Sequence, residues 1–379
     1  MVRRFSKFSR FAANALVPLV SLASLGSLVS ATNGCSNTTN APASAPAPLV
    51  SVQAEKDAQG NYTLSWDPVA ADATVEVTAG TSPDAIDHGR VLARAAASAR
   101  KVTVSGLDAG KRWYFEVGPS GGASTVVGER HVRLTGASNY RDLGGYIAAD
   151  GRAVRWGAAF RSDHLGKIDA RDVDYLTGMG VKLAFDFRTD KEVQKSPDTI
   201  ADGARIAYER GAIVLPIDPK AILESGTVID EPFLTKVYTD IIDTNAAVFA
   251  KLFRQLGETG TRSMVFHCTG GKDRAGIASA LLLAFLGVSD DTITRDYALS
   301  DTYNAQSVKA QEDAMRAQGQ DPAKLGVALK SPPGVVQGML DHVRSKYGSV
   351  DAYLKSGGLD DLALAKVRAA LLTEAHPTR

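Results

Sequence analysis

Short alternating segments dominate residues 48–134. Hydrophobic and polar positions alternate within each segment, and clusters of Gly, Pro, Asp and Asn separate one segment from the next. This alternation, with many β-branched and aromatic residues, is typical of strands that bury one face. The clearest segments are NYTLSW (61–66), TVEVTA (74–79), RKVTVSGL (100–107) and RWYFEVG (112–118). The pattern predicts an all-β sandwich domain over residues 48–134.

The pattern changes over residues 135–379. Continuous apolar runs of the buried-strand type alternate there with segments of helical periodicity, and the tail predicts several short helices. The runs are VKLAFDFR (181–188) and SMVFHC (263–268), the helical segments are NAAVFAKLFRQLGE (245–258) and AGIASALLLAFLGV (275–288), and the tail covers 331–374. Alternating strands and helices predict an α/β domain with helical additions.

The chain begins with a pattern that is typical of an export signal. Residues 1–10 contain several basic residues and no acidic one, and the apolar segment FAANALVPLVSLASLGSLVSA (11–31) follows. Pro18 and several serines make this segment a poor membrane-spanning helix. We therefore expect residues 1–34 to be a cleaved signal peptide rather than a permanent anchor.

Cys35 ends the segment TNGC (32–35), which is similar to the site where bacterial lipoproteins are cut and diacylated. Residues 35–47 are rich in Ser, Asn, Ala and Pro, a composition that is typical of a solvated tether. We expect lipidation of Cys35 and attachment to the bacterial cell envelope. In the alternative, Cys35 is removed with the signal and the protein is secreted.

Composition and charge narrow the classes of function. The chain has 43 Lys and Arg against 42 Asp and Glu, so no global field favours nucleic acid. Cys35 and Cys268 are the only cysteines, which excludes a disulfide scaffold and a tetrathiolate metal site. The six histidines lack the spacing of zinc ligands. We expect no metal, no cofactor and no nucleic-acid partner.

The segment HCTGGKDRAG (267–276) joins a predicted strand to a predicted helix. Helix N-termini present free N–H groups and partial positive charge, and glycines let backbone amides turn towards one centre. A phosphate dianion fits such a loop. The residues that we expect to contact phosphate are Thr269, Gly270, Gly271, Lys272, Ala275 and Gly276.

Cys268 and Arg274 stand at the two ends of this loop. The reactive form of cysteine is the thiolate, which helix N-termini and nearby cations stabilise. The spacing lets the chain curl around a phosphoryl group, so that the guanidinium faces the sulfur and binds phosphoryl oxygens. We predict attack of Cys268 on phosphorus, a cysteinyl-phosphate intermediate and its hydrolysis by water. His267 is expected to point into the fold and support the loop.

The leaving oxygen needs a proton, and Asp273 is the first candidate to supply it. In the alternative, Asp273 caps the helix that follows. Asp186 and Asp163 are weaker candidates for the acid. Lys272 is expected either to bind a further phosphate of the substrate or to lie exposed at the rim of the loop.

Together with other segments, this loop resembles the protein tyrosine phosphatase superfamily, and within it the family of bacterial tyrosine and lipid phosphatases. The similar segments are SNYRDLGGY (138–146), FRSDHL (160–165), FDFRTDKEV (185–193), DYALSDTY (296–303) and YGSVDAYL (347–354). The resemblance implies an α/β phosphatase domain over 135–379, with a central sheet flanked by helices. It also implies hydrolysis of phosphotyrosine, and some members accept phosphoserine, phosphothreonine or phosphoinositides.

The resemblance implies roles for the loop residues. Cys268 is the nucleophile, Arg274 binds the phosphate, and Asp273 supplies the proton in place of a mobile acid loop. Lysine at the position of Lys272 is shared with phosphoinositide phosphatases. A hydroxyl residue often follows the arginine in this family. Ala275 replaces it here, which predicts slower breakdown of the cysteinyl-phosphate. No metal or organic cofactor is implied.

The predicted sandwich resembles a fibronectin type III domain. LSWDP (64–68) is similar to its second strand, with Trp66 as the core tryptophan, and LDAGKRWYFEV (107–117) is similar to the turn and strand near its end. Trp113 stands where that family usually has a corner tyrosine. We expect this domain to space or dock the phosphatase domain.

Several charged residues upstream of the loop lie in apolar surroundings. Arg141 and Asp142 are expected to support the loop through a buried ion-pair network, or alternatively to line the mouth of the site. For Arg188 and Glu192 we expect a buried ion pair with each other. Two other functions stay open: a phosphoinositide or inositol-phosphate phosphatase, and a non-catalytic surface protein that binds a phosphorylated ligand.

Overall fold

The computed structural model describes residues 49–68, 73–216, 229–258 and 263–375, which fall within one compact unit, Ala45–Arg379. The predicted signal peptide, the tether and Cys35 lie outside the described residues. Within the described ranges, no helix combines the length and the apolar composition that crossing a membrane requires. The predicted domain boundary after residue 134 stays a prediction.

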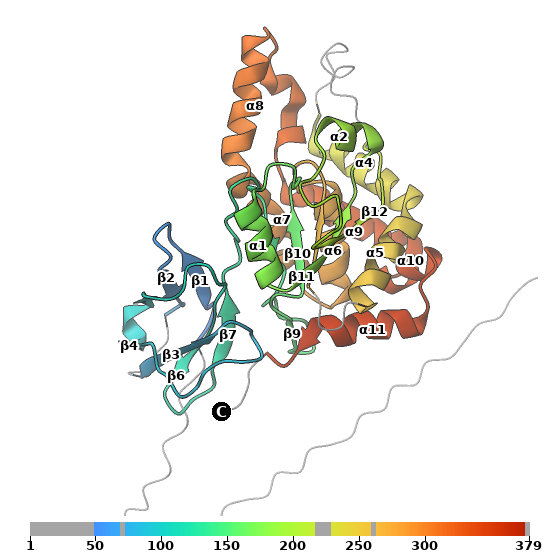
Figure 1. Ribbon diagram of the computed structural model, residues 1–379. Coiled ribbons are helices and arrows are strands. Elements are labelled where there is room, and N and C mark those ends of the chain that lie inside the picture. The colour runs from blue at the N-terminus through green and yellow to red at the C-terminus, as the bar shows by residue number, and fades with distance from the viewer. Residues whose placement is uncertain (1–48, 69–72, 217–228, 259–262, 376–379) are drawn as a thin grey trace, which may run out of the picture. The chain divides into compact units, whose positions relative to one another are not determined.

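The N-terminal part of the described chain forms two antiparallel sheets (Figure 1). All four predicted strands form, and three further strands join them. One sheet has the order β1 (Gln53–Lys56), β2 (Tyr62–Ser65), β5 (Lys101–Val104), and the other β4 (Ala93–Ala96), β3 (Thr74–Gly80), β6 (Tyr114–Pro119), β7 (Thr125–Gly128). A short 3-10 turn, η1 (Ala97–Ala99), links β4 to β5. One hydrophobic cluster draws on both sheets, as the alternating pattern requires.

Two tryptophans fix this part of the fold. Trp66 is buried in the cluster, and its Nε1 donates to the carbonyl of Ala97 over 2.8 Å. Trp113 donates from Nε1 to the carbonyl of Asp108 over 3.0 Å. An indole N–H therefore makes the kind of bond, to a carbonyl a few residues upstream, that a corner tyrosine makes through its hydroxyl.

A five-stranded mixed sheet forms the centre of the second part, in the order β12, β11, β13, β10, β8. Its strands are β8 (Arg141–Asp142), β10 (Ala159–Ser162), β11 (Val181–Asp186), β12 (Ala207–Arg210) and β13 (Ser263–His267). All neighbours are parallel except β8, which runs antiparallel to β10. A separate pair joins β9 (Ala153–Val154) to β14 (Leu372–Thr373). Ligands of such sheets bind at the carboxyl ends of the strands, which is where the loop after β13 lies.

Helices cover this sheet (Figure 1). The most buried is α6 (Arg274–Phe285), in which every residue except Ala284 is buried, in accord with its apolar sequence. The others are α1 (Ala170–Gly178), α2 (Asp190–Lys195), α4 (Glu231–Thr244), α5 (Ala246–Glu258), α7 (Asp290–Tyr303), α8 (Ala305–Ala317), η2 (Pro322–Leu329), α9 (Pro333–Tyr347), α10 (Val350–Ser356) and α11 (Asp361–Leu371). The α/β fold and the run of short C-terminal helices are confirmed.

Candidate active site

The predicted strand–loop–helix order is confirmed around Cys268, which directly follows β13 and precedes α6. The turn requires glycine at one position. Gly271 has φ +66°, and a Cβ on it would lie 2.6 Å from the backbone N of Asp163. A Cβ on Gly270 would meet no atom within 4 Å, so the surrounding packing requires glycine only at Gly271.

Side chains from outside the loop hold its carbonyl groups. The carbonyl of Gly270 accepts from Nδ2 of Asn139 over 3.0 Å and from Nδ2 of Asn304 over 2.9 Å. Arg161 donates from Nη2 to the carbonyl of Gly271 over 2.7 Å. In a trans peptide the C=O of one residue and the N–H of the next point in opposite directions. Because the two carbonyl groups point towards Asn139, Asn304 and Arg161, the N–H groups that follow them point away from these side chains. The loop is thereby prepared to present N–H groups to an anion.

Glu192 holds the guanidinium of Arg274. Its carboxylate accepts from Nη1 over 2.8 Å and from Nη2 over 2.6 Å, and Oε1 also accepts from Oγ1 of Thr269 over 2.5 Å. Burial alone would lower the pKa of Arg274, but the bonds to Glu192 and the charge of Cys268 raise this pKa above its ordinary value. Arg274 is therefore a fixed cation beside the sulfur.

The predicted ion pair between Arg188 and Glu192 is wrong. Arg188 instead bridges two buried carboxylates, with Nη2 lying 3.0 Å from Asp186 Oδ2 and 2.7 Å from Asp198 Oδ2. Glu192 lies in the first turn of α2, where it also closes a capping box with Thr189, and from there its side chain reaches Arg274.

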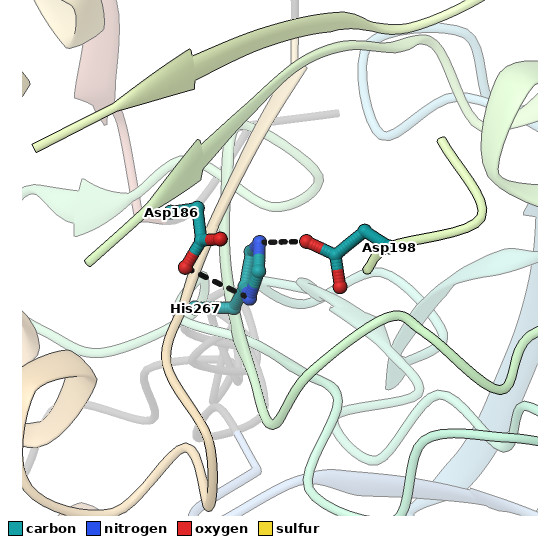
Figure 2. Close-up of side chains that lie close together, drawn as sticks. All are labelled: Asp186, Asp198 and His267. Atoms are coloured by element: carbon teal, nitrogen blue, oxygen red, sulfur yellow. Dashed lines mark ion pairs between the residues drawn. The ribbon is translucent and has the colours of Figure 1, made fainter. Parts of the chain in front are cut away.

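His267 lies in the interior between the same two carboxylates, as Figure 2 shows. Its Nε2 is 3.2 Å from Asp198 Oδ2 and its Nδ1 is 3.8 Å from Asp186 Oδ1. Among the described residues, these three alone form a group close enough to hold a metal ion. Arg188 already supplies a positive charge to both carboxylates, so the arrangement is that of an ion-pair network. Asp186 is fully buried within it, which removes Asp186 as a candidate acid.

Arg141 and Asp142 are both fully buried, so the interpretation that they line the mouth of the site is wrong. Arg141 pairs with Asp296 over 3.2 Å, and Asp142 pairs with Arg112 over 2.7 Å. Asp296 also pairs with Arg161, which holds the loop carbonyls. The structure therefore agrees with the ion-pair interpretation. The ion pairs connect Arg141 to the loop through Asp296 and Arg161.

Asp273 begins α6, but its side chain makes no capping hydrogen bond. Oδ1 instead accepts from the hydroxyl of Tyr238 over 2.7 Å. The helix-cap alternative is therefore wrong. Asp163, the other candidate acid, accepts backbone N–H groups of Ser138 and Asn139 and acts as a structural anchor.

Lys272 follows neither expectation, because it is buried and bonded within the protein. Its Nζ donates to the carbonyl of Ala328 over 2.5 Å and to that of Lys330 over 2.9 Å, and it lies 3.1 Å from Asp273 Oδ1. The ammonium group is not exposed at a rim, and its partners here are protein oxygens.

A cavity of about 440 Å³ opens over the loop. Cys268, Thr269, Gly270, Lys272, Asp273 and Arg274 all border it, whereas Ala275 and Gly276 are buried in α6. Half of the remaining lining is apolar, from Leu215, Ile229, Leu234, Val308, Leu325, Ala328 and Leu329, and the other half is polar. The structure therefore brings the predicted nucleophile, phosphate ligand and acid together at one cavity.

Several residues of this site carry no signal in the sequence that links them to the loop. Asn139 and Arg161 lie in two of the segments that resemble the phosphatase family. The sequence gives no sign that their side chains bind carbonyl groups of the loop. Asn304 and Tyr238 lie far from the loop along the chain and carry no local motif. Only the folded structure, which brings α4 and the junction of α7 and α8 to the loop, reveals them.

Comparison with known proteins is consistent with this geometry. The tyrosine phosphatase family matches residues 132–373. A protein of Cupriavidus necator named as a tyrosine-protein phosphatase is 32% identical over 246 residues, which cover 64% of this chain and 89% of that protein. A tyrosine-protein phosphatase of Nostoc commune is 31% identical over 224 residues, covering 58% of this chain and 76% of that protein.

A more distant relative is the triple specificity protein phosphatase PtpB of Mycobacterium tuberculosis, 25% identical over 276 residues that cover 63% of this chain and 98% of that protein. Among solved structures, TpbA of P. aeruginosa in complex with pTyr has a TM-score of 0.27 at 13% identity, covering 55% of this chain and 91% of that chain. The family match spans the central sheet, the loop with Cys268 and Arg274, and the helices that support it. The chain belongs to the tyrosine phosphatase family.

Proposed function

We propose that this protein hydrolyses phosphotyrosine through a cysteinyl-phosphate intermediate on Cys268. The observation that carries the proposal is at Arg274. Its Nη groups are engaged by Glu192, while its buried Nε has no hydrogen-bond partner among the described residues. A buried donor without a partner costs about 1–3 kcal/mol. A phosphoryl oxygen bound at the sulfur supplies the missing acceptor.

The geometry supports the following steps. The thiolate of Cys268 attacks phosphorus while the bond from phosphorus to the tyrosyl oxygen breaks, and Asp273 gives that oxygen a proton. Water then attacks phosphorus, the S–P bond breaks, inorganic phosphate leaves, and Asp273 takes the proton from water. Arg274 and the loop amides stabilise the charge on the equatorial oxygens in both steps.

The lining of the cavity supports an aromatic substrate. Leucine and isoleucine side chains of α4, η2 and the segments before α4 border the same cavity as the loop residues. Burial of a phenyl ring against these side chains is favourable. Phosphotyrosine is the phosphomonoester that combines one dianionic group with an aromatic ring.

The alternative substrate, a phosphoinositide, rested on Lys272 as a second phosphate ligand. The bonds of Lys272 to two carbonyl groups give that alternative no support. A non-catalytic phospholigand-binding protein is set aside, because the relatives are named as phosphatases and the nucleophile, acid and arginine border one cavity.

The direct test is Cys268→Ser in the mature protein. We expect hydrolysis of a phosphotyrosine peptide to be lost while binding of orthovanadate persists, because only the nucleophile is removed. Side-by-side rates on the peptide and on a soluble phosphoinositide identify the substrate class. Residual turnover in Cys268→Ser, or faster hydrolysis of the phosphoinositide, would contradict the proposal.

We also propose that the protein is exported, either as an envelope lipoprotein attached through Cys35 or as a secreted protein. The basic and apolar N-terminal segments and the following tether support export. The mass of the N-terminal peptide of the mature protein distinguishes a diacylated Cys35 from a chain that begins beyond it.

A further inference from the structure

The candidate acid Asp273 is held by a residue from a distant helix. Tyr238, in the middle of α4, is fully buried and donates its hydroxyl to Asp273 Oδ1 over 2.7 Å. The ammonium of Lys272 contacts the same oxygen. Among the described residues, no hydrogen bond falls on Oδ2, and the carboxylate is partly exposed at the cavity. One oxygen is therefore anchored, and the other is left for the reacting group.

Tyr238 has a second hydroxyl beside it. Its oxygen lies 2.7 Å from the hydroxyl oxygen of Tyr297, a buried residue of α7, and either group can be the donor. The rings meet edge to face, with centroids 6.2 Å apart. Burial raises the pKa of both tyrosines above the ordinary value, so both hydroxyls keep their protons at neutral pH.

We propose that Tyr238, backed by Tyr297, is a positioning residue that keeps Asp273 in place in both of its protonation states. The inference rests on the proposed function, in which Asp273 gives a proton in the first step and takes one in the second. The proton is given and taken at Oδ2, so Oδ1 keeps a lone pair for the tyrosine hydroxyl whether or not the acid is protonated. The hydroxyl therefore donates to Oδ1 in both states, and this contact survives each proton transfer.

The tyrosine bond takes the place of a helix cap. The structure has Asp273 at the N-cap position of α6 without a capping bond, and Oδ1 accepts from Tyr238 instead. A capping bond would direct a carboxylate oxygen to the free N–H groups at the start of α6. The carboxylate is held instead from α4, by a residue that is distant in the chain.

The test compares Tyr238→Phe, Asp273→Asn and the double variant on aryl phosphates with leaving phenols of different acidity. The matched control is Tyr353→Phe, which also removes a buried hydroxyl, one that donates to the carbonyl of Ile242 over 2.9 Å. In Asp273→Asn we expect a loss of about a hundredfold or more for the least acidic phenol and a small loss for p-nitrophenyl phosphate. In Tyr238→Phe we expect a loss of roughly three- to tenfold for the least acidic phenol, since Asp273 loses one of its hydrogen bonds.

The double variant shows whether Tyr238 acts through Asp273 or independently of it. If Tyr238 acts through Asp273, adding Tyr238→Phe to Asp273→Asn produces no further dependence on the leaving group, and Tyr353→Phe retains full activity. A loss in Tyr238→Phe that is equal for all leaving groups, or that persists in the Asp273→Asn background, overturns the inference. If Asp273→Asn itself shows no dependence on the leaving group, the role of Asp273 in the proposed function fails, which is a different result.

Discussion

Gly270 and Gly271 are adjacent in the loop after β13, but the surrounding structure constrains them differently. Gly271 has a left-handed φ and lies against the backbone of Ser162 and Asp163, at the carboxyl end of β10. Gly270 has space for a side chain, and its fixed feature is its carbonyl group, held by two asparagines. From the sequence, both are simply glycines of one turn.

We therefore expect Gly271→Ala to lower kcat/KM for p-nitrophenyl phosphate by about a hundredfold, because the loop must shift to admit the Cβ. Gly270→Ala is the matched control and is expected to stay within about threefold of the parent. Affinity for orthovanadate, measured by inhibition, should follow the same order. Equal effects of the two substitutions would contradict the assigned difference.

At the scale of elements, the site is assembled by secondary structures that are distant in the chain. Glu192 comes from α2 and holds the arginine at the start of α6. Asn304 comes from the junction of α7 and α8, and Tyr238 from α4. Each makes polar contacts with the loop after β13 or with the first residue of α6. The helices therefore position the loop in addition to covering the sheet.

Glu192→Gln tests the contact between α2 and α6. We expect roughly a ten- to hundredfold loss of kcat/KM, because a charged partner of Arg274 is replaced by a neutral one that cannot accept two bonds from the guanidinium. Much of the loss should appear as weaker orthovanadate binding.

Glu209→Gln provides the control for Glu192→Gln. Glu209 pairs with Lys251 over 3.1 Å and is 32% exposed, close to the 31% of Glu192. This variant is expected to retain the parent activity. If Glu192→Gln also retains it, Arg274 does not depend on α2 for its orientation.

At the scale of the molecule, a buried ion-pair network joins the helical layer to the sheet. Asp296 of α7 binds Arg141 of β8 and Arg161 of β10. Burial alone would raise the pKa of Asp296, but the two arginines outweigh it and lower this pKa from 3.8 to about 2. Burial, with the charge of Arg141, lowers the pKa of Arg161 to about 10. Fold stability and loop geometry therefore depend on the same charges.

This network predicts the response to acid. A carboxyl with a lowered pKa in the folded state stabilises the fold fully above its unfolded pKa, and the stabilisation is lost as pH falls through the folded pKa. The stabilisation that Asp296 provides is therefore lost as the pH falls from 3.8 to about 2. Asp296→Asn should lower the free energy of unfolding by about 3–5 kcal/mol at pH 7, since it leaves two buried arginines unpaired.

Urea unfolding of the full chain at pH 7 and at pH 3 checks this expectation, and the difference between parent and variant should shrink at the lower pH. The exposed pair of Asp150 with Arg152 supplies the control, because Asp150→Asn should have little effect at either pH. A difference that does not change with pH would mean that Asp296 is not the group that titrates.

The prediction from sequence succeeded where the signal was local. The strands around Trp66 and Phe266, the apolar helix α6 and the loop between Cys268 and Arg274 all follow from periodicity and spacing. It failed where side chains choose among several partners of similar chemistry. Arg188 and Glu192 are both charged and near each other in the chain, but each pairs with a residue brought close by the sheet.

Local sequence was enough to predict the α/β class, the strand–loop–helix order and the placement of Cys268 and Arg274 at the two ends of one loop, because each depends on residues close together in the chain. The surroundings of these residues became visible only in the folded molecule. The fold placed Glu192 on Arg274, Tyr238 on Asp273 and two carbonyl groups on Lys272. These contacts join residues separated by dozens of positions, and hydrogen bonds between such residues are set by the packing of helices against the sheet, which no local pattern encodes.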